Sequence, residues 1–319
     1  MQTRIQGTTM PVLDVQLDPN ESVFSESGEL SWMTASIQMT THTQMGGGGG
    51  LFGILKRVAG GGSIFMTEYR AYQYPGEVSF ATKVPGHIVP VQVGPGQEYL
   101  VHRHGFLCAT PQVSISVGFQ QSLGAGIFGG DGFLLQKIGG VGMAWLELSG
   151  ELIVKNLAPG EMLRVHPGHV GAFQASVSFQ ITTVPGIKNM IFGGDGFLLQ
   201  KIGGMGMAWL ELSGELVVKN LAPGEMLRVH PGHVGAFQAS VSFQITTVPG
   251  IKNMIFGGDG LFLAVLVGPG TVWLQTLPIS RLAHQISEYL PRGENRQVAP
   301  AAGGALLGGI VGSILGGDQ

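Results

Sequence analysis

The stretch Ile127-Phe128-Gly129-Gly130-Asp131-Gly132 opens a segment of 64 residues, 127–190, which the chain repeats as residues 191–254. The two copies differ at only two positions, Val141 against Met205 and Ile153 against Val217. The opening stretch recurs a third time from Ile255 and then diverges. A segment that can be inserted whole and end to end behaves as a structural module, so the sequence predicts a repeat protein.

The same spacing of 64 residues extends beyond the two copies. A histidine recurs with this spacing at His102, His166 and His230, and a tryptophan recurs with it at Trp145, Trp209 and Trp273. The chain therefore divides into about four cycles of one unit, of which the middle two are nearly identical.

We predict six segments. They are a lead at 1–10, a first β region at 11–126 with a glycine-rich loop at 46–50, β units at 127–190 and 191–254, a closing partial unit with a short helix at 255–290, and a glycine-rich tail at 291–319.

Composition limits the class of protein. Apolar residues make up 44% of the 319 residues and charged residues only 12%, which excludes a disordered chain. The formal charge of −3 gives no reason to expect DNA binding. Cys108 is the single cysteine, so an internal disulfide framework is excluded and a reducing compartment is favoured. The first residues lack the apolar core of a signal peptide, and we expect a cytoplasmic protein.

The secondary structure is expected to consist of short strands. Val177, Phe179 and Ile181 alternate with polar residues, which is the period of a half-buried strand. Turn sequences separate such runs, at 129–132, 149–151, 159–161, 167–169 and 185–187. The spacing of the strands predicts an all-β fold of repeated units in a double-stranded β-helix or sandwich. One C-terminal helix is expected, capped by Ser280 and ended by Pro291.

Several motifs, in this order, resemble those of one family. They are Ser63–Tyr69, the Phe-Gly-Gly-Asp-Gly-Phe-Leu-Leu-Gln-Lys run at 128–137, Leu148–Leu152 and Gly268–Thr276. The resemblance is to a bacterial-type member of the family named for altered inheritance of mitochondria, and it covers residues 11–290. It implies three similar β units, a relationship to the trp RNA-binding attenuation protein superfamily, and a trimer in which units form a ring. This chain departs from that pattern by carrying an extra tandem copy of one unit.

The first candidate sites are a nucleotide motif and a metal motif. The run 124–129 matches Gly-x-Gly-x-x-Gly, but a further glycine turn follows where a dinucleotide site needs a helix. His102-Arg103-His104 is close to the His-x-His of double-stranded β-helix metal enzymes, yet residues 105–111 supply no carboxylate. His166 and His169 lie in a predicted turn, and two histidines alone form a weak site.

The remaining polar candidates are explained by local structure. Asp131, Asp195 and Asp259 lie in glycine-rich turns, where aspartate bonds the local backbone. The sequence contains no evident Ser-His-Asp or Cys-His nucleophile arrangement. We therefore assign no catalytic, cofactor-binding or metal-ligating residue, and expect no cofactor and no enzyme activity.

The tail between Ala301 and Gly317 is uncharged, with Gly304, Gly308, Gly312 and Gly316 four residues apart. Small residues at this spacing occur where membrane helices pack. However, 17 residues are at the short limit for spanning a bilayer, and glycine weakens helices. A disordered or loosely docked tail is favoured over a segment for partner binding or self-association, and both are favoured over a membrane anchor at 301–317.

The sequence favours a non-catalytic, self-assembling β protein that acts as a scaffold or binding platform. Apolar strands and few charges imply shared interfaces, so we expect a homo-oligomer, with a trimer preferred. A ring that binds RNA or a small ligand is the alternative, from superfamily analogy. Each middle unit carries only three lysines and one arginine, which argues against RNA. A metal-dependent enzyme of the double-stranded β-helix type is the third hypothesis.

Overall fold

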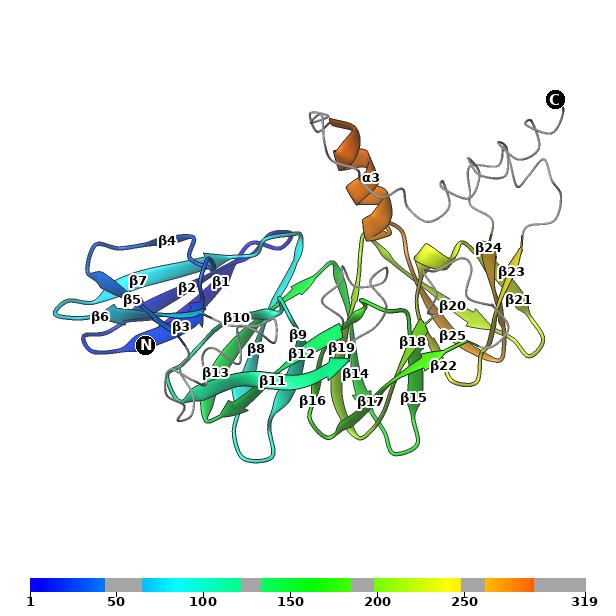
Figure 1. Cartoon of the computed structure of the whole chain (residues 1–319), viewed down its shortest axis with the longest axis horizontal. Helices are drawn as coiled ribbons and strands as arrows, with labels where there is room; N and C mark the ends of the chain where they lie inside the picture. The colour runs from blue at the N-terminus through cyan, green and yellow to red at the C-terminus, as the bar shows by residue number, and fades with distance from the viewer. Residues whose placement is uncertain (44–64, 122–132, 185–197, 248–261, 290–319) are drawn as a thin grey trace, which may run out of the picture.

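The computed structural model describes residues 1–43, 65–121, 133–184, 198–247 and 262–289. Over these ranges the chain forms antiparallel sheets and one short C-terminal helix, which confirms the predicted all-β class. The strands group into four successive units that follow one another along the long axis of the molecule (Figure 1).

Unit 1 holds the strands β1 (Gln2–Gln6), β2 (Val12–Leu17), β3 (Ser22–Glu26), β4 (Trp32–Met33), β5 (Ile37–Thr43), β6 (Phe65–Ala71) and β7 (Gly76–Ala81). Unit 2 holds β8 (Gly86–Val93), β9 (Tyr99–His102), β10 (Phe106–Ala109), β11 (Val113–Gln121), β12 (Phe133–Gly140) and β13 (Gly142–Ser149).

Unit 3 holds β14 (Glu151–Leu157), β15 (Met162–Val165), β16 (Val170–Gln174), β17 (Val177–Thr183), β18 (Leu198–Gly204) and β19 (Gly206–Leu212). Unit 4 holds β20 (Leu216–Leu221), β21 (Met226–Val229), the 3-10 turn η1 (Pro231–His233), β22 (Val234–Gln238), β23 (Ser242–Thr247), β24 (Phe262–Val267) and β25 (Gly270–Gln275). The helix α3 (Ile279–Tyr289) follows.

Neighbouring units share their sheets. Units 2, 3 and 4 each place three strands in one sheet and three in another, whereas unit 1 places four in one sheet and three in another. The second set of each unit from 1 to 3 joins the first set of the next unit. The resulting six-stranded sheets have the orders β5-β6-β3-β10-β13-β8, β11-β12-β9-β16-β19-β14 and β17-β18-β15-β22-β25-β20. A four-stranded sheet, β1-β2-β7-β4, closes the first end, and a three-stranded sheet, β21-β24-β23, forms the other.

The sequence copy and the structural unit have the same length but different starting points. The copy at 127–190 supplies β12 and β13 to unit 2 and β14 to β17 to unit 3. Its boundaries fall in segments 122–132 and 185–197, outside the described residues. The duplication therefore inserted a whole set of strands without interrupting a described one.

The core crosses the junctions between units. Trp145, Trp209 and Trp273 lie on β13, β19 and β25, and each is at most 8% exposed. Trp209 of unit 3 packs in a cluster made mainly by unit 2, where its ring centroid lies 6.0 Å from that of Tyr99. Burying a tryptophan at each junction stabilises the stacking of units, because aromatic side chains contribute the largest apolar areas.

The turns follow the predicted glycine chemistry. Gly150, Gly160 and Gly168, in the predicted turns at 149–151, 159–161 and 167–169, have positive φ angles of 64°, 84° and 88°. Glycine adopts this conformation without the steric penalty of a side chain. The predicted turns at 129–132 and 185–187 lie outside the described residues.

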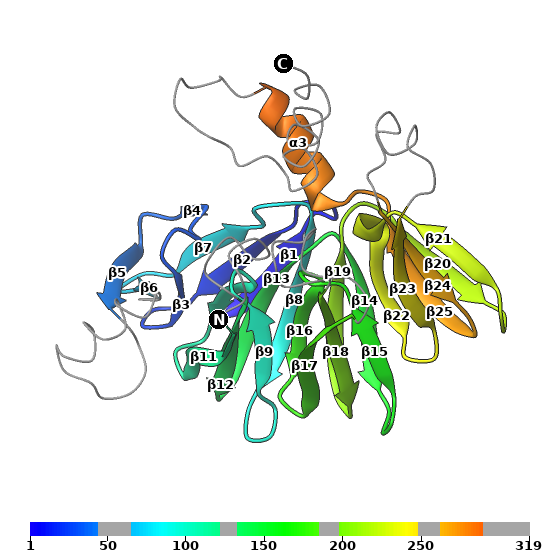
Figure 2. The ribbon, with the colours of Figure 1, turned by 45° about the vertical axis from the view of Figure 1, so that its right-hand side comes forward.

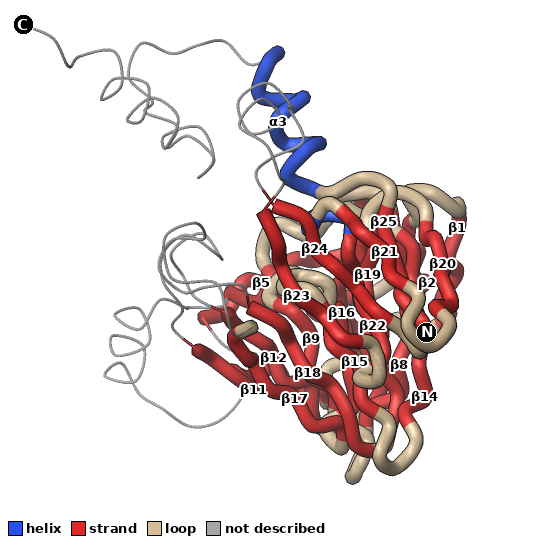
Figure 3. Tube along the Cα trace, turned by 90° about the vertical axis from the view of Figure 1, so that its right-hand side faces the viewer, coloured by secondary structure: helices blue, strands red, loops and turns tan. Residues whose placement is uncertain are grey.

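The predicted C-terminal helix is confirmed, but the prediction that Ser280 caps it is wrong. The helix begins at Ile279, and the carbonyl of Pro278 accepts the N–H groups of Arg281 and Leu282 at 2.9 and 3.3 Å. Ser280 therefore lies in the first turn. Figures 1, 2 and 3 show α3 projecting away from the sheets, in agreement with exposed side chains at residues 281–289.

Candidate functional site

One position of the repeat carries a buried polar side chain at each junction. Glu147, Glu211 and Gln275 are 64 residues apart on β13, β19 and β25, and each is 4–5% exposed. Each accepts a backbone N–H from the preceding unit through its Oε1 atom. The donors and distances are Lys83 N at 2.5 Å, Ser149 N at 2.8 Å and Ser213 N at 2.9 Å. These side chains therefore tie successive units together.

A second repeated position places a polar side chain beside the first. Glu26 and His102 end β3 and β9, and His166 and His230 follow β15 and β21. The Nε2 atom of His102 lies 3.1 Å from Oε1 of Glu211, across the junction of units 2 and 3. Burial opposes the charged imidazolium, but the Glu211 carboxylate outweighs it and raises the pKa of His102.

The junction of units 1 and 2 is rich in charge. The Nζ atom of Lys83 lies 2.6 Å from Oε1 of Glu29 and 3.4 Å from Oε2 of Glu147. The amide of Gln136 donates to Oε1 of Glu26 at 2.5 Å. Burial raises the pKa values of Glu26 and Glu29, because carboxylates lose hydration there. This junction is held by the exposed side chain of Lys83, whose ammonium two largely buried carboxylates share.

The junction of units 3 and 4 replaces these charges by neutral groups. The Nδ1 atom of His169 lies 2.8 Å from the carbonyl of Glu211, so Nδ1 must donate. Its Nε2 atom then accepts from the Gln275 amide at 3.1 Å. Burial lowers the pKa of His169, and burial together with His169 lowers the pKa of His166 to about 3. Both histidines are neutral at physiological pH.

The histidines of the metal hypothesis have other interactions in the structure. His102 is occupied by Glu211, and burial with Arg103 lowers the pKa of His104. Within the described ranges, no group of three or more histidine, cysteine, aspartate and glutamate residues could hold a metal ion. Cys108 is fully buried, and burial raises the pKa of its thiol well above the ordinary value.

Sequence reasoning missed the partner of His102. The sequence prediction required a carboxylate within a few residues of His104, whereas Glu211 comes from the next unit. A signal for this contact was present in the sequence, because the histidines His102 and His166 and the glutamates Glu147 and Glu211 recur with the same spacing of 64 residues. The run 124–129, the turns with Asp131, Asp195 and Asp259, and the tail at 301–317 lie outside the described residues.

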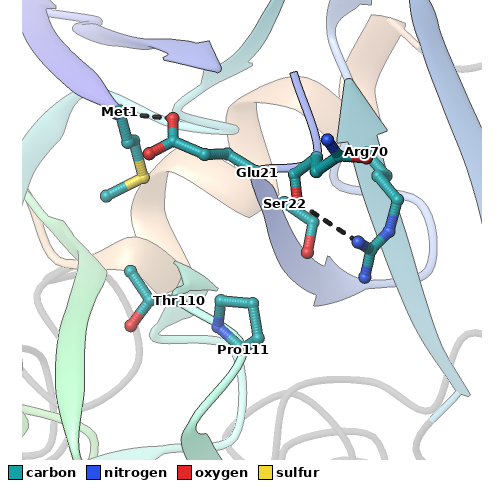
Figure 4. A pocket seen from close by; sticks show the side chains of 7 residues that line it. Met1, Glu21, Ser22, Arg70, Thr110 and Pro111 are labelled. Carbon is teal, nitrogen blue, oxygen red and sulfur yellow. Dashed lines mark hydrogen bonds and ion pairs between the residues drawn. The ribbon is translucent and has the colours of Figure 1, made fainter. Parts of the chain in front are cut away.

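A shallow cleft of about 330 Å³ lies between units 1 and 2 (Figure 4). It is lined by Met1, Asn20, Glu21, Ser22, Arg70, Thr110 and Pro111. Its charged groups pair with one another or with nearby groups. The Met1 ammonium lies 2.5 Å from Glu21, and Arg70 binds Glu68 at 2.6 Å and the Asn20 carbonyl at 3.2 Å. This arrangement favours a structural role for the cleft.

The model of the family described as "Mitochondrial biogenesis AIM24" matches residues 3–200 and 186–277. The chain belongs to the AIM24 family. An uncharacterised protein of Streptococcus pyogenes serotype M6 is 25% identical over 194 residues, which cover 59% of this chain and 76% of the relative. A crystal structure of a Streptococcus pyogenes protein is 18% identical with a TM-score of 0.42, covering 91% of this chain and 99% of that one.

Among the helices in the described ranges, none is both long enough and apolar enough to cross a bilayer.

Proposed function

We propose that this AIM24-family protein is a non-catalytic, self-assembling β scaffold that serves as a binding platform. One observation carries the proposal. The units join strand to strand, through β3 with β10, β9 with β16 and β15 with β22, so each shared sheet continues across a junction. A fold that extends by adding strands to open edges is suited to assembly, because edge strands present unpaired backbone groups.

The buried polar groups support a structural role. The acceptor oxygens of Glu147, Glu211 and Gln275 are directed at backbone N–H groups of the preceding unit. Such groups fix the register of the units. We propose on this basis that the protein has no enzymatic activity and needs no cofactor, and that a homo-oligomer, with a trimer preferred, is its working form.

The alternative is a ring that binds RNA or a small ligand, as a relationship to the trp RNA-binding attenuation protein superfamily would imply. It has less support because two lysines of the repeat have partners within the chain. The Nζ atom of Lys137 lies 2.8 Å from Glu98, and that of Lys155 lies 5.1 Å above the Trp273 ring. Phosphate binding needs cations that are available to the ligand. A metal-dependent enzyme ranks third.

We also propose a cytoplasmic location, with membrane contact through residues 301–317 as the alternative. Separation of membranes from cytosol by ultracentrifugation tests this proposal. Recovery of the full chain in the membrane pellet, and of a chain ending at Gln297 in the supernatant, would support the alternative.

Native mass spectrometry of the full chain tests the proposed scaffold function. We expect a homo-oligomer of the 33.5 kDa chain without a stoichiometric metal or small molecule. A monomer at micromolar concentration would refute self-assembly. One zinc, iron or copper ion per chain, lost in the variant with His102→Ala and His104→Ala, would favour the metal enzyme.

A further inference from the structure

The chain contains one strand sequence in two different settings. Met-Leu-Arg-Val forms β15 at 162–165 and β21 at 226–229. In β15, which lies between β18 and β22, Leu163 and Val165 are fully buried. In β21, Leu227 and Val229 are only partly buried. The same two side chains are therefore more exposed at the end of the molecule than inside it.

The difference in exposure arises because β21 lacks a second neighbouring strand. Within the described residues β21 pairs with β24 alone, at the edge of the three-stranded sheet β21-β24-β23. Its counterparts β9 and β15 each pair with a further strand, β16 and β22, from the next unit. The edge at β21 is thus the open equivalent of an interface that the chain forms three times, since β3 with β10 is a further instance. Figure 3 looks onto this end of the molecule.

The backbone groups at this edge can be identified from β15. The carbonyl of Met162 accepts from Ala239 N at 3.1 Å, and His166 N donates to Gly235 O at 2.8 Å. Bonding alternates along an antiparallel strand, so the backbone of Arg164, between these residues, also faces β22. The backbone of Arg228, at the same position of β21, therefore faces away from β24.

The opposite end of the molecule carries the complementary edge. β4 occupies the position in the sheet β1-β2-β7-β4 that β10, β16 and β22 occupy in the other sheets. Among the described strands it pairs with β7 alone, and Trp32 and Met33 are 51% and 39% exposed. The N–H of Thr34 donates to Glu77 O of β7 at 2.9 Å, so the Met33 backbone faces outward by the same alternation. Figure 2 shows β4 and β21 at opposite ends.

We propose that β21 binds β4 of a second copy of this chain as an added antiparallel strand. The inference rests on the proposed self-assembly and specifies the surface that performs it. A second copy is the expected partner because its β4 is equivalent to β16 and β22, the strands that β9 and β15 bind within the chain. Arg228 does not prevent pairing, since the identical Arg164 lies in a paired strand. Such a head-to-tail contact closes as a ring or extends as a chain of molecules.

Two proline variants of the full chain test this pairing. Proline removes one N–H and is tolerated where that group faces away from the sheet. Arg228→Pro blocks the β21 edge, and Met33→Pro blocks the β4 edge. We expect each variant alone to be a 33.5 kDa monomer by light scattering, with the far-ultraviolet circular dichroism of the wild type. Arg228→Ala, which keeps the N–H, should assemble like the wild type.

Mixing the two variants gives the decisive measurement. The Met33→Pro chain keeps its β21 edge and the Arg228→Pro chain keeps its β4 edge, so the mixture should form a 1:1 dimer and nothing larger. A mixture that remains monomeric overturns the pairing. An oligomer that persists in Arg228→Pro also overturns it, while leaving the proposed self-assembly intact. A wild-type chain that is itself monomeric refutes both proposals.

Discussion

The Nε2 atom of His102 lies 3.1 Å from Oε1 of Glu211, although 109 positions separate them in the sequence. This pair bridges units 2 and 3. Among the junctions between the described units, only this one places a histidine beside a carboxylate at this repeat position. The junction on one side has Lys83 between carboxylates, and the junction on the other has neutral Gln275. Nearly identical units are therefore joined by chemically different contacts.

The His102–Glu211 pair should make stability depend on pH. The pKa of His102 is raised from its ordinary value of 6.5, so the folded state binds the proton more tightly than the unfolded state. Its stabilising effect is fully present below pH 6.5 and is lost as pH rises through the folded pKa. We expect Glu211→Gln, which imitates Gln275, to lower the free energy of unfolding by about 1 kcal/mol more at pH 5.5 than at pH 8.5.

Urea denaturation at both pH values measures this difference. His102→Gln should remove the same pH dependence. His284→Gln, on the exposed helix α3, should preserve it and serves as the control. An equal cost of Glu211→Gln at the two pH values would show that the pair does not titrate in this range.

Two equivalent glutamines should respond oppositely to the same substitution. Gln136 and Gln200 are 64 residues apart and buried, but only Gln136 donates to a partner, Glu26. Within the described part of the chain, both amide atoms of Gln200 lack a hydrogen-bond partner. A buried donor or acceptor that lacks a hydrogen-bond partner lowers stability by about 1–3 kcal/mol. We expect Gln200→Met to raise the free energy of unfolding by about 1 kcal/mol and Gln136→Met to lower it, as measured by urea denaturation.

Two turn glycines should differ sharply in their tolerance of alanine. Gly150 and Gly160 both have positive φ, so alanine carries a backbone cost of about 1 kcal/mol at either position. At Gly160 an added Cβ meets nothing within 4 Å, whereas at Gly150 it would lie 2.0 Å from the Leu212 carbonyl. We expect Gly160→Ala to fold with a slightly lower melting temperature, and Gly150→Ala to lose several times as much stability. Similar melting temperatures for the two variants would contradict the close approach at Gly150.

The sequence predicted the strands and the spacing of the units, but not where a unit begins. Any frame of a tandem repeat is equivalent in sequence, and only strand pairing places the unit boundary near Gly150 rather than Ile127. The contact of His102 with Glu211 was missed for a related reason, because it joins different units and has no local signal. Ser280 was assigned as a cap by residue type, whereas the Pro278 carbonyl receives the first helical bonds.

Deletion of residues 191–254 should leave a complete three-unit protein. The deletion removes β18 to β23 and joins β17 to β24. Unit 3 then consists of β14 to β17 with β24 and β25, which replace β18 and β19. Strand alternation is preserved, because Met190 is followed by Ile255 in place of the identical Ile191, and no apolar face turns outward. The terminal edge passes from β21 to β15, which has the same sequence.

We therefore expect the shortened chain to fold at least as stably as the full chain and to form the more uniform oligomer. Each junction that remains keeps its buried tryptophan, Trp145 at the first and Trp273 at the second, so little core is lost per unit. Thermal melts and light scattering on both chains measure this. If the shortened chain aggregates while the full chain gives one sharp species, the fourth unit is integral to the fold and the units are not interchangeable modules.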